Sequence, residues 1–397
     1  MDAIQAELQP GELVLAYLDD NYLVTAPGRA RAAYDTAARV LRVACGIEIN
    51  QGKLVSWNRS NQPAPPGIAE LDTPGHVVWR ADLPAGQNGV RVVGTPIGSD
   101  EFVRVCATEA AAGSADLLDR IPQLPASQDA WLLLLFCAVP RINHILRTTP
   151  PTQAAALAAA HDERISTAFD QLLGLPPDCD TQTDHGVGRR VWLRQARLPL
   201  RLGGCGLRDS ARTSPAAYWA SVADCLPVLH GRYPQAAAAM VDALETLEVA
   251  QAVPSSALGG AVAAGRALDT RGFEGRPTWR ALAAGARPPP QEGANVDEFP
   301  ALDEFPHGWQ FYASRALEQT EHDSLLRSLA GTSPRGPLPG RARLRSCSGP
   351  QAASWMVAFP TSPTTRLSNE EFTFALRRRL SLGFGFLRNR ARRIFQW

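Results

Sequence analysis

The sequence predicts an α+β protein, with strands near the N-terminus and mostly helices after them. Three observations lead to this fold class. Short runs rich in Val, Leu and Tyr, separated by turn residues, occupy the first 98 positions. From Asp100 onward, apolar residues recur at helical spacing in alanine-rich segments. The 397 residues include 32 Gly and 32 Pro, which predicts several long loops between the elements.

The beginning of the chain predicts a hairpin and then a helix. Leu13–Tyr17 and Tyr22–Thr25 are apolar runs on either side of Leu18-Asp19-Asp20-Asn21, which is a turn sequence. Arg29–Cys45 has apolar residues at helical spacing, and Gly46 follows it as a C-terminal cap.

Further short strands are predicted up to residue 98. Ile47–Trp57 alternates like a strand, a turn and a second strand, and a proline-rich loop follows it. His76–Arg80 and Val90–Val93 predict a second hairpin, with Gly94–Gly98 as a rigid turn beyond it. The range 1–98 is therefore predicted as one strand-containing domain.

Beyond residue 98 the pattern is helical, with Ser99 and Ser127 as predicted N-caps. A helical domain over 99–270 is predicted to contain Asp100–Leu118, Ser127–Leu146, Thr152–Leu173, Arg189–Arg197, Pro215–Leu229 and Gln235–Ala250. The range 271–306 is predicted as a proline-rich acidic linker that ends in a tandem Asp-Glu-Phe-Pro repeat. A last helical region, 307–397, is predicted to hold Gly308–Ala330, Pro350–Phe359 and Ser368–Leu380 before a basic tail.

Composition excludes several classes of protein. With 40 Lys+Arg against 39 Asp+Glu, the chain is not uniformly basic, and 45% hydrophobic content excludes wholesale disorder. Seven dispersed cysteines without a CxxC pair argue against a disulfide framework and favour an intracellular, reducing compartment. The longest apolar run, Trp131–Pro140, is too short for a membrane span, so we expect a buried helix and no membrane.

The near-neutral net charge conceals an uneven distribution. Residues 341–397 contain eleven arginines and two glutamates, a net charge of +9. Arg377–Arg379 and the arginines of 388–393 stand near Phe384 and Trp397, a basic and aromatic mixture that suits nucleic acid. A solvated, arginine-rich surface is the alternative. Lys53 is the single lysine of the chain.

Asp19 and Asp20 are the most informative pair of residues. They are adjacent carboxylates within the otherwise mostly apolar run 14–24, so they repel each other and lose hydration if this run is buried. Bound Mg²⁺ would offset both effects, because this ion prefers hard oxygen ligands. The local sequence leaves a plain turn equally open, since Asp and Asn are common turn residues.

Four blocks in the same order resemble reverse transcriptases of LINE-type (non-LTR) retrotransposons. Tyr17-Leu18-Asp19-Asp20 resembles their YxDD motif, and Gly46–Lys53 resembles the G-x-x-x-N-x-x-K block after it. Val92–Gly98 resembles the LGxPxG primer-grip hairpin, and Arg197–Leu207 resembles the LPxRxGGxGL segment. The resemblance covers roughly the range 1–230. It implies a partial right-hand polymerase palm made of antiparallel hairpins plus a helix, followed by a mostly α-helical thumb and connector.

The resemblance also implies the roles of particular residues. Asp19 corresponds to a ligand of both catalytic Mg²⁺ ions, and Asp20 corresponds to a less direct ligand nearer the primer end. Tyr17 would lie beneath the primer terminus. Lys53 corresponds to a basic residue that protonates or steadies the pyrophosphate, a task for which lysine can release a proton and arginine cannot. The implied partners are an RNA template and a DNA primer.

Other residues are candidates for holding nucleic acid. Gly94 and Gly98 belong to the primer-grip block, and Arg377, Arg378 and Arg379 belong to the basic C-terminal region. Arg141 and Arg147 either follow the template or primer backbone or face solvent on a surface helix. His161-Asp162-Glu163, on an alanine-rich helix, is predicted to be a solvated face rather than a metal site.

The resemblance fails upstream of the YxDD motif. The family has a further metal-binding Asp on an earlier strand, whereas only sixteen residues precede Tyr17, and Asp2 lies too close to serve. A two-metal site that lacks one carboxylate should lose most of its activity. The sequence therefore predicts a truncated reverse transcriptase that is inactive by itself. The alternative is a nucleic-acid-binding module without catalysis.

Overall fold

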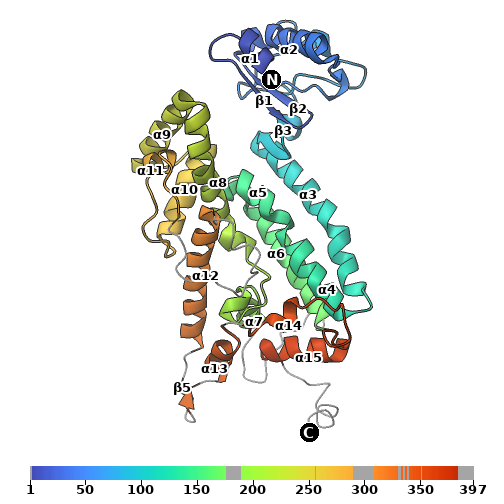
Figure 1. Ribbon diagram of the computed structural model, residues 1–397, viewed down its shortest axis with the longest axis vertical. Coiled ribbons are helices and arrows are strands. Elements are labelled where there is room, and N and C mark those ends of the chain that lie inside the picture. The colour runs from blue at the N-terminus through green and yellow to red at the C-terminus, as the bar shows by residue number, and fades with distance from the viewer. Residues whose placement is uncertain are drawn as a thin grey trace. The chain divides into compact units, whose positions relative to one another are not determined.

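A computed structural model describes residues 2–175, 189–254, 256–288, 308–329, 332–333, 336–337, 339–349 and 351–382. The chain divides into two compact units, an N-terminal unit of residues 1–109 and a helical unit of residues 110–397 (Figure 1). The division falls inside helix α3 (Asp100–Arg120), which Ser99 caps by accepting the Phe102 amide on its hydroxyl at 3.0 Å. The helix thus begins at Asp100, directly after the predicted boundary at residue 98, whereas the two compact units divide after Glu109.

The N-terminal unit contains two antiparallel hairpins and one long helix. Each hairpin is a separate two-stranded sheet, β1 with β2 and β3 with β4. The described elements are α1 (Asp2–Glu7), β1 (Leu13–Tyr17), β2 (Asp20–Val24), η1 (Pro27–Arg29), α2 (Ala30–Cys45), η2 (Gln51–Lys53), η3 (Ala69–Leu71), η4 (Ala85–Gln87), β3 (Gly89–Val92) and β4 (Thr95–Gly98).

Helix α2 anchors the first hairpin. Its buried face includes Ala37 and Val40, which pack against Ile4 of α1 and Val14 of β1. The helix ends as predicted at Gly46, whose φ of 67° is the left-handed conformation that glycine adopts without strain. The first predicted hairpin and helix are therefore confirmed, although the second strand begins at Asp20, two residues before its predicted start at Tyr22.

Two sequence-based predictions in this unit are wrong. Ile47–Trp57 does not form two strands: it contains η2, and Ser56 makes only an isolated bridge to Trp79. The alternation is overridden because Asn50 accepts the Gly52 amide at 3.0 Å and bends the chain into a turn. In the second hairpin, β3 pairs with β4 and not with His76–Arg80, because Val93 and Gly94 reverse the chain directly.

The helical unit is built around helix α8 (Ser210–Arg232), which contacts α5, α6, α10 and α12 (Figure 1). Its other described elements are η5 (Ile121–Gln123), α4 (Ser127–Leu133), η6 (Leu134–Ala138), η7 (Val139–Ile142), α5 (Asn143–Thr148), α6 (Pro151–Leu172), α7 (Arg189–Ala196), η8 (Leu200–Leu202), α9 (Pro234–Val249), α10 (Ala257–Asp269), α11 (Trp279–Ala283), α12 (Trp309–Ser328), β5 (Thr332–Ser333), β6 (Gly336–Pro337), α13 (Pro339–Ser346), α14 (Ser354–Val357) and α15 (Asn369–Arg379).

Helix α8 begins five residues before the predicted start at Pro215. Asp209 is its N-cap and accepts the Arg212 amide at 2.8 Å. The carboxylate of Asp162 accepts the next two free amides, those of Ser210 at 3.0 Å and Ala211 at 3.3 Å. These two carboxylates satisfy amide groups that have no partner inside the helix, so the helix extends back to Ser210.

The predicted helix Ser127–Leu146 is interrupted. It consists of α4, a π-helical turn η6, the 3₁₀ turn η7 and α5, because Pro140 has no amide hydrogen to continue the regular ladder. Ser127 is not the N-cap; its amide donates to Asn369 Oδ1 at 2.8 Å. By length and composition, Ser127–Thr148 is the one described stretch apolar enough to cross a membrane. Its Trp131 lies fully buried in the core, so this is weak evidence for a span.

The range 271–306 is not a linker over its described part. Phe273 and Trp279 are buried beside Trp219 of α8 and Trp309 of α12 in one aromatic cluster. The tandem Asp-Glu-Phe-Pro repeat and the residues from 383 to the C-terminus lie outside the described residues. The described chain is mostly helical with small antiparallel hairpins, which agrees with the predicted α+β class.

Candidate functional site

The two adjacent carboxylates lie at the tip of the first hairpin. Tyr17 pairs with Asp20, so Leu18 and Asp19 form a two-residue turn between the strands. Leu18 adopts a φ of 55°, a conformation that costs free energy for a residue with a branched side chain. Asp19 and Asp20 are both exposed. The turn therefore presents both carboxylates to solvent.

The hairpin is more exposed than the sequence predicts. In β1 only Val14 is buried, and the apolar side chains of Leu15, Tyr17 and Leu18 are 43%, 57% and 87% exposed. Because the carboxylates remain hydrated, burial does not by itself require a cation beside them. The loss of hydration that a buried run would impose on Asp19 and Asp20 therefore does not occur.

Tyr22 links the carboxylate turn to the second hairpin. Its hydroxyl donates a hydrogen bond to Asp20 Oδ2 at 3.2 Å and accepts one from the backbone amide of Val93 at 3.1 Å. Figure 1 shows β1, β2 and β3 gathered in one part of the N-terminal unit. Two blocks that lie far apart in the sequence are thus joined through one hydroxyl group.

The second hairpin reverses through Val93 and Gly94, at φ values of 49° and 77°. Positive φ at both central residues is the geometry of a type I′ turn, and it explains the glycine at Gly94. Gly98 has a different requirement. It pairs with Gly89, and a Cβ atom added to it would lie 2.6 Å from Gly89 Cα and 2.8 Å from the Phe102 ring. Gly98 is therefore explained by the close approach of the Asn88 carbonyl, the Gly89 backbone and the Phe102 ring, which leaves no room for a side chain.

Glu12 fixes the open end of the first hairpin. Its carboxylate is 6% exposed and accepts hydrogen bonds from the Thr25 hydroxyl at 2.7 Å, the Gln9 amide at 2.8 Å and Arg29 Nε at 3.2 Å. The Thr25 hydrogen bond is the largest cause of a lowered pKa of Glu12. Nothing in the sequence singled out Glu12 or Tyr22, since isolated acids and tyrosines carry no recognisable spacing.

Lys53 is the last residue of the 3₁₀ turn η2 and is exposed. Within the described residues its ammonium group forms no ion pair with Asp19 or Asp20. The structure therefore does not bring the single lysine into contact with the carboxylates, and its role stays a prediction.

The two carboxylates at the turn supply some of the oxygen ligands that a hard divalent cation needs. Two exposed carboxylates are suitable Mg²⁺ ligands, since this ion commonly takes one or two carboxylates together with water or phosphate oxygens. Among the described residues, no cluster of three or more His, Cys, Asp or Glu side chains could hold a metal ion. Asp19 and Asp20 could thus contribute to a metal site, but the described residues do not complete one for two metals.

The predicted arginines differ in their availability. Arg141 is exposed. Arg147 joins three helices, because it bonds Gln310 of α12 and lies 3.5 Å from the Asp224 carboxylate of α8. Its backbone carbonyl also accepts the Ser221 hydroxyl at 2.5 Å. A structural role therefore explains Arg147 better than contact with a nucleic-acid backbone does.

Arg379 cannot bind nucleic acid in this fold. It is 5% exposed, and its guanidinium donates to the carbonyls of Gly204 at 2.9 Å, Leu200 at 3.2 Å, Cys347 at 3.0 Å and Ala352 at 3.1 Å. It ties the segment that resembles LPxRxGGxGL to the C-terminal helices. Its neighbour Arg378 is exposed, and Arg377 is half-buried, although the sequence does not distinguish the three.

The segment His161-Asp162-Glu163 is not a solvated face. His161 and Asp162 are 8% and 6% exposed, and only Glu163 faces solvent. The Asp162 carboxylate is buried because it accepts hydrogen bonds from the amides that begin α8. Burial is the largest cause of its raised pKa. An alanine-rich helix gives few clues to which side is covered, so this burial was not predictable from spacing.

One known protein is similar to part of this chain. No model of a known protein family matches the chain, and no solved structure matches it. A retrotransposable element SLACS 132 kDa protein of Trypanosoma brucei gambiense is 28% identical over 119 residues. The match covers 30% of this chain and only 9% of the trypanosome protein. The chain is thus similar, over part of its length, to a retrotransposon protein, and this similarity suggests a retroelement-related origin.

Proposed function

We propose that the N-terminal unit is the YxDD part of a reverse transcriptase palm and that the helical unit is its thumb and connector. The hydrogen bonds of Tyr22 carry this proposal. They join the turn with Asp19 and Asp20 to the hairpin that resembles a primer grip, two blocks that the resemblance places in the same site. The similarity to a retrotransposon protein supports the same origin.

The proposed chemistry assigns a task to each residue. Asp19 and Asp20 would hold Mg²⁺, which when bound would activate the primer 3′-oxygen and stabilise the departing pyrophosphate. Tyr22 orients the Asp20 carboxylate by its hydrogen bond. The ring of Tyr17 is exposed next to this turn and offers a surface for the last base of the primer. Lys53 would supply a proton to the leaving group.

We further propose that the 397-residue chain by itself does not extend primers. Its described residues place two carboxylates at the hairpin turn, and they contain no third acidic ligand beside them. The absence of a bridging carboxylate should cost most of the transition-state stabilisation that two metals supply. Such a chain would still bind an RNA template and a DNA primer, which is the second candidate function.

Primer extension tests this proposal. The assay uses a DNA primer on an RNA template, with Mg²⁺ or Mn²⁺, and compares the chain with Asp19→Ala and with Asp82→Ala as an exposed carboxylate elsewhere in the unit. We expect no extension from any of the three. Extension by the unchanged chain that disappears in Asp19→Ala alone would show a complete catalytic site and refute the predicted inactivity.

Metal binding provides the complementary measurement. Titration with Mn²⁺, followed by its paramagnetic resonance signal, should reveal weak binding that Asp19→Asn and Asp20→Asn each reduce and Asp82→Asn leaves unchanged. If the three variants bind Mn²⁺ equally well, the pair is only a turn and the proposed palm assignment loses its chemical basis.

A further inference from the structure

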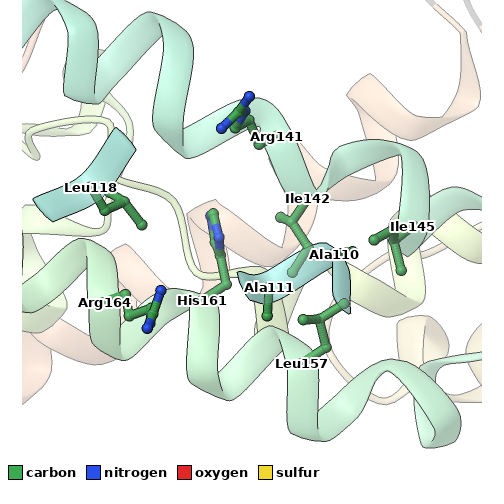
Figure 2. A pocket seen from close by; sticks show the side chains of 9 residues that line it. All are labelled: Ala110, Ala111, Leu118, Arg141, Ile142, Ile145, Leu157, His161 and Arg164. Carbon is green, nitrogen blue, oxygen red and sulfur yellow. The ribbon is translucent and has the colours of Figure 1, made fainter. Parts of the chain in front are cut away.

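The helical unit contains a small cavity that is distinct from the carboxylate turn. Its nine lining residues come from α3, η7, α5 and α6, and they are Ala110, Ala111, Leu118, Arg141, Ile142, Ile145, Leu157, His161 and Arg164 (Figure 2). The cavity volume is about 60 Å³, which is room for a few water molecules. Six of the lining residues are apolar, so the three polar side chains determine what can enter.

Two of these polar side chains are cations. Arg141 and Arg164 are exposed, and within the described residues neither guanidinium forms an ion pair or a hydrogen bond. No acidic residue lines the cavity. The nearby Asp162 does not neutralise them directly, because its carboxylate is bound to the first amides of α8. The cavity is therefore suited to an anionic group at its exposed edge.

His161 supplies the third polar group, and it lies deeper. The side chain is 8% exposed, and its ring hydrogen bonds to the backbone carbonyl of Val139. Its Nε2 atom is buried without a partner in the described structure. In the view of Figure 2 the ring lies between the guanidinium groups of Arg141 and Arg164. A buried polar atom without a partner costs free energy, and its position in a cavity indicates a ligand.

The protonation state of the His161 ring determines whether the ligand must donate or accept a hydrogen bond at Nε2. Burial is the largest cause of the lowered pKa of His161, so the ring is neutral at neutral pH. The Val139 carbonyl can only accept a hydrogen bond, so the bonded ring nitrogen, Nδ1, carries the single hydrogen. Nε2 is then an acceptor. The cavity thus combines an acceptor in its interior with two cationic donors at its edge.

We propose that this cavity binds a phosphorylated ribose, with the phosphate on Arg141 and Arg164 and the neighbouring hydroxyl on His161 Nε2. The 2′-hydroxyl is the donor that RNA has and DNA lacks, and it lies next to the 3′-phosphate. The same chemistry is present in a free ribonucleotide and in an RNA strand. The inference depends on the helical unit alone and needs neither Asp19 nor Asp20.

Binding of matched oligonucleotides tests the hydroxyl contact. Fluorescence anisotropy compares a single-stranded RNA of about ten nucleotides with a DNA of the same sequence. We expect the chain to prefer RNA. His161→Phe keeps a ring of similar size without the acceptor, and it should weaken RNA binding about threefold to tenfold while DNA binding stays unchanged. Equal affinity of the unchanged chain for RNA and DNA would overturn the proposal.

Salt dependence tests the phosphate contact with surface variants that do not disturb the core. Arg141→Gln and Arg164→Gln should each reduce the slope of log affinity against log salt by about 0.7, the value for one phosphate on a single strand. Arg232→Gln, an exposed arginine at the end of α8, is the matched control and should leave the slope unchanged. If the two cavity variants behave like this control, the proposal is wrong, even where His161→Phe fails to fold.

Competition distinguishes the two sources of the phosphorylated ribose. A ribonucleoside 3′-monophosphate in large excess should displace the RNA if a single nucleotide, with its 2′-hydroxyl in the cavity and its phosphate at the edge, is sufficient for binding. Failure to displace it, together with the preference for RNA, assigns the site to an RNA strand. The Asp19 and Asp20 variants test the palm assignment alone. A loss of primer binding in them would leave the proposal for this cavity unaffected, because neither residue lines it.

Discussion

The Tyr22 hydroxyl accepts a hydrogen bond from the Val93 amide at 3.1 Å, across 71 positions of the sequence. The same hydroxyl donates to Asp20 at 3.2 Å, so one side chain connects a carboxylate turn with a second hairpin. The two hairpins share no strand pairing, since each forms its own two-stranded sheet. Their relative position therefore depends on side-chain contacts such as this one.

Removal of this hydroxyl should loosen the connection without unfolding the unit. We expect Tyr22→Phe to lower the free energy of unfolding by at most about 1 kcal/mol, because both hydrogen bonds of the hydroxyl are exposed to water. Hydrogen exchange at the Val93 amide should become faster. Tyr34→Phe is the control, because the Tyr34 hydroxyl has no hydrogen-bond partner among the described residues. Equal exchange at Val93 in both variants would contradict the bridging role.

The glycine at position 98 should not tolerate a methyl group. Gly98→Ala would place Cβ 2.6 Å from Gly89 Cα and against the Asn88 carbonyl, so we expect a loss of about 1 to 3 kcal/mol in thermal or denaturant unfolding. Gly113→Ala in α3 meets no atom within 4 Å and should stabilise the helix by about 0.5 to 1 kcal/mol. A neutral Gly98→Ala would show that the hairpin is looser than the structure indicates.

Neighbouring arginines in α15 should respond very differently to removal. Arg379→Ala leaves one buried and three partly buried carbonyls without their donor, and we expect a loss of about 3 kcal/mol in the free energy of unfolding. Arg378→Ala removes an exposed side chain and should change stability by less than about 0.5 kcal/mol. Similar losses in the two variants would contradict the assignment of Arg379 as a structural residue.

The stability of the N-terminal unit should depend on the ionisation of Glu12. Its pKa in the fold is below its ordinary value of 4.5, mainly through the Thr25 hydroxyl and also through Gln9 and Arg29. The ionised carboxylate therefore stabilises the fold above about pH 4.5, and this contribution is lost as the pH falls through the folded-state pKa.

Denaturation at several pH values tests this contribution. Glu12→Gln should be less stable than the unchanged chain at neutral pH, and the difference should shrink as the pH falls below 4.5 and through the folded-state pKa, because the carboxyl then becomes protonated. Asp82→Asn, an exposed carboxylate change in the same unit, should show no comparable pH-dependent difference. A Glu12→Gln difference that stays constant over this range would rule out the ionised carboxylate as its cause.

The parts of the fold that the sequence predicted are those with local causes. The first hairpin follows from its turn residues, and α2 ends at Gly46 because only a few backbone conformations can end a helix there. The same local logic fails at Ile47–Trp57, where alternation predicted strands. A strand needs a partner to pair with, and the Asn50 turn bends the chain away before one can form.

The candidate site shows the same division. The sequence alone determined that Asp19 and Asp20 stand together at a turn, because adjacency and turn propensity belong to consecutive residues. Only the tertiary structure decided that Tyr22 links them to Val93, that Arg379 is buried while Arg378 is exposed, and that His161 enters a cavity beside two arginines. Burial and distant contacts are created when separate elements pack together, and residues with identical side chains then meet different surroundings.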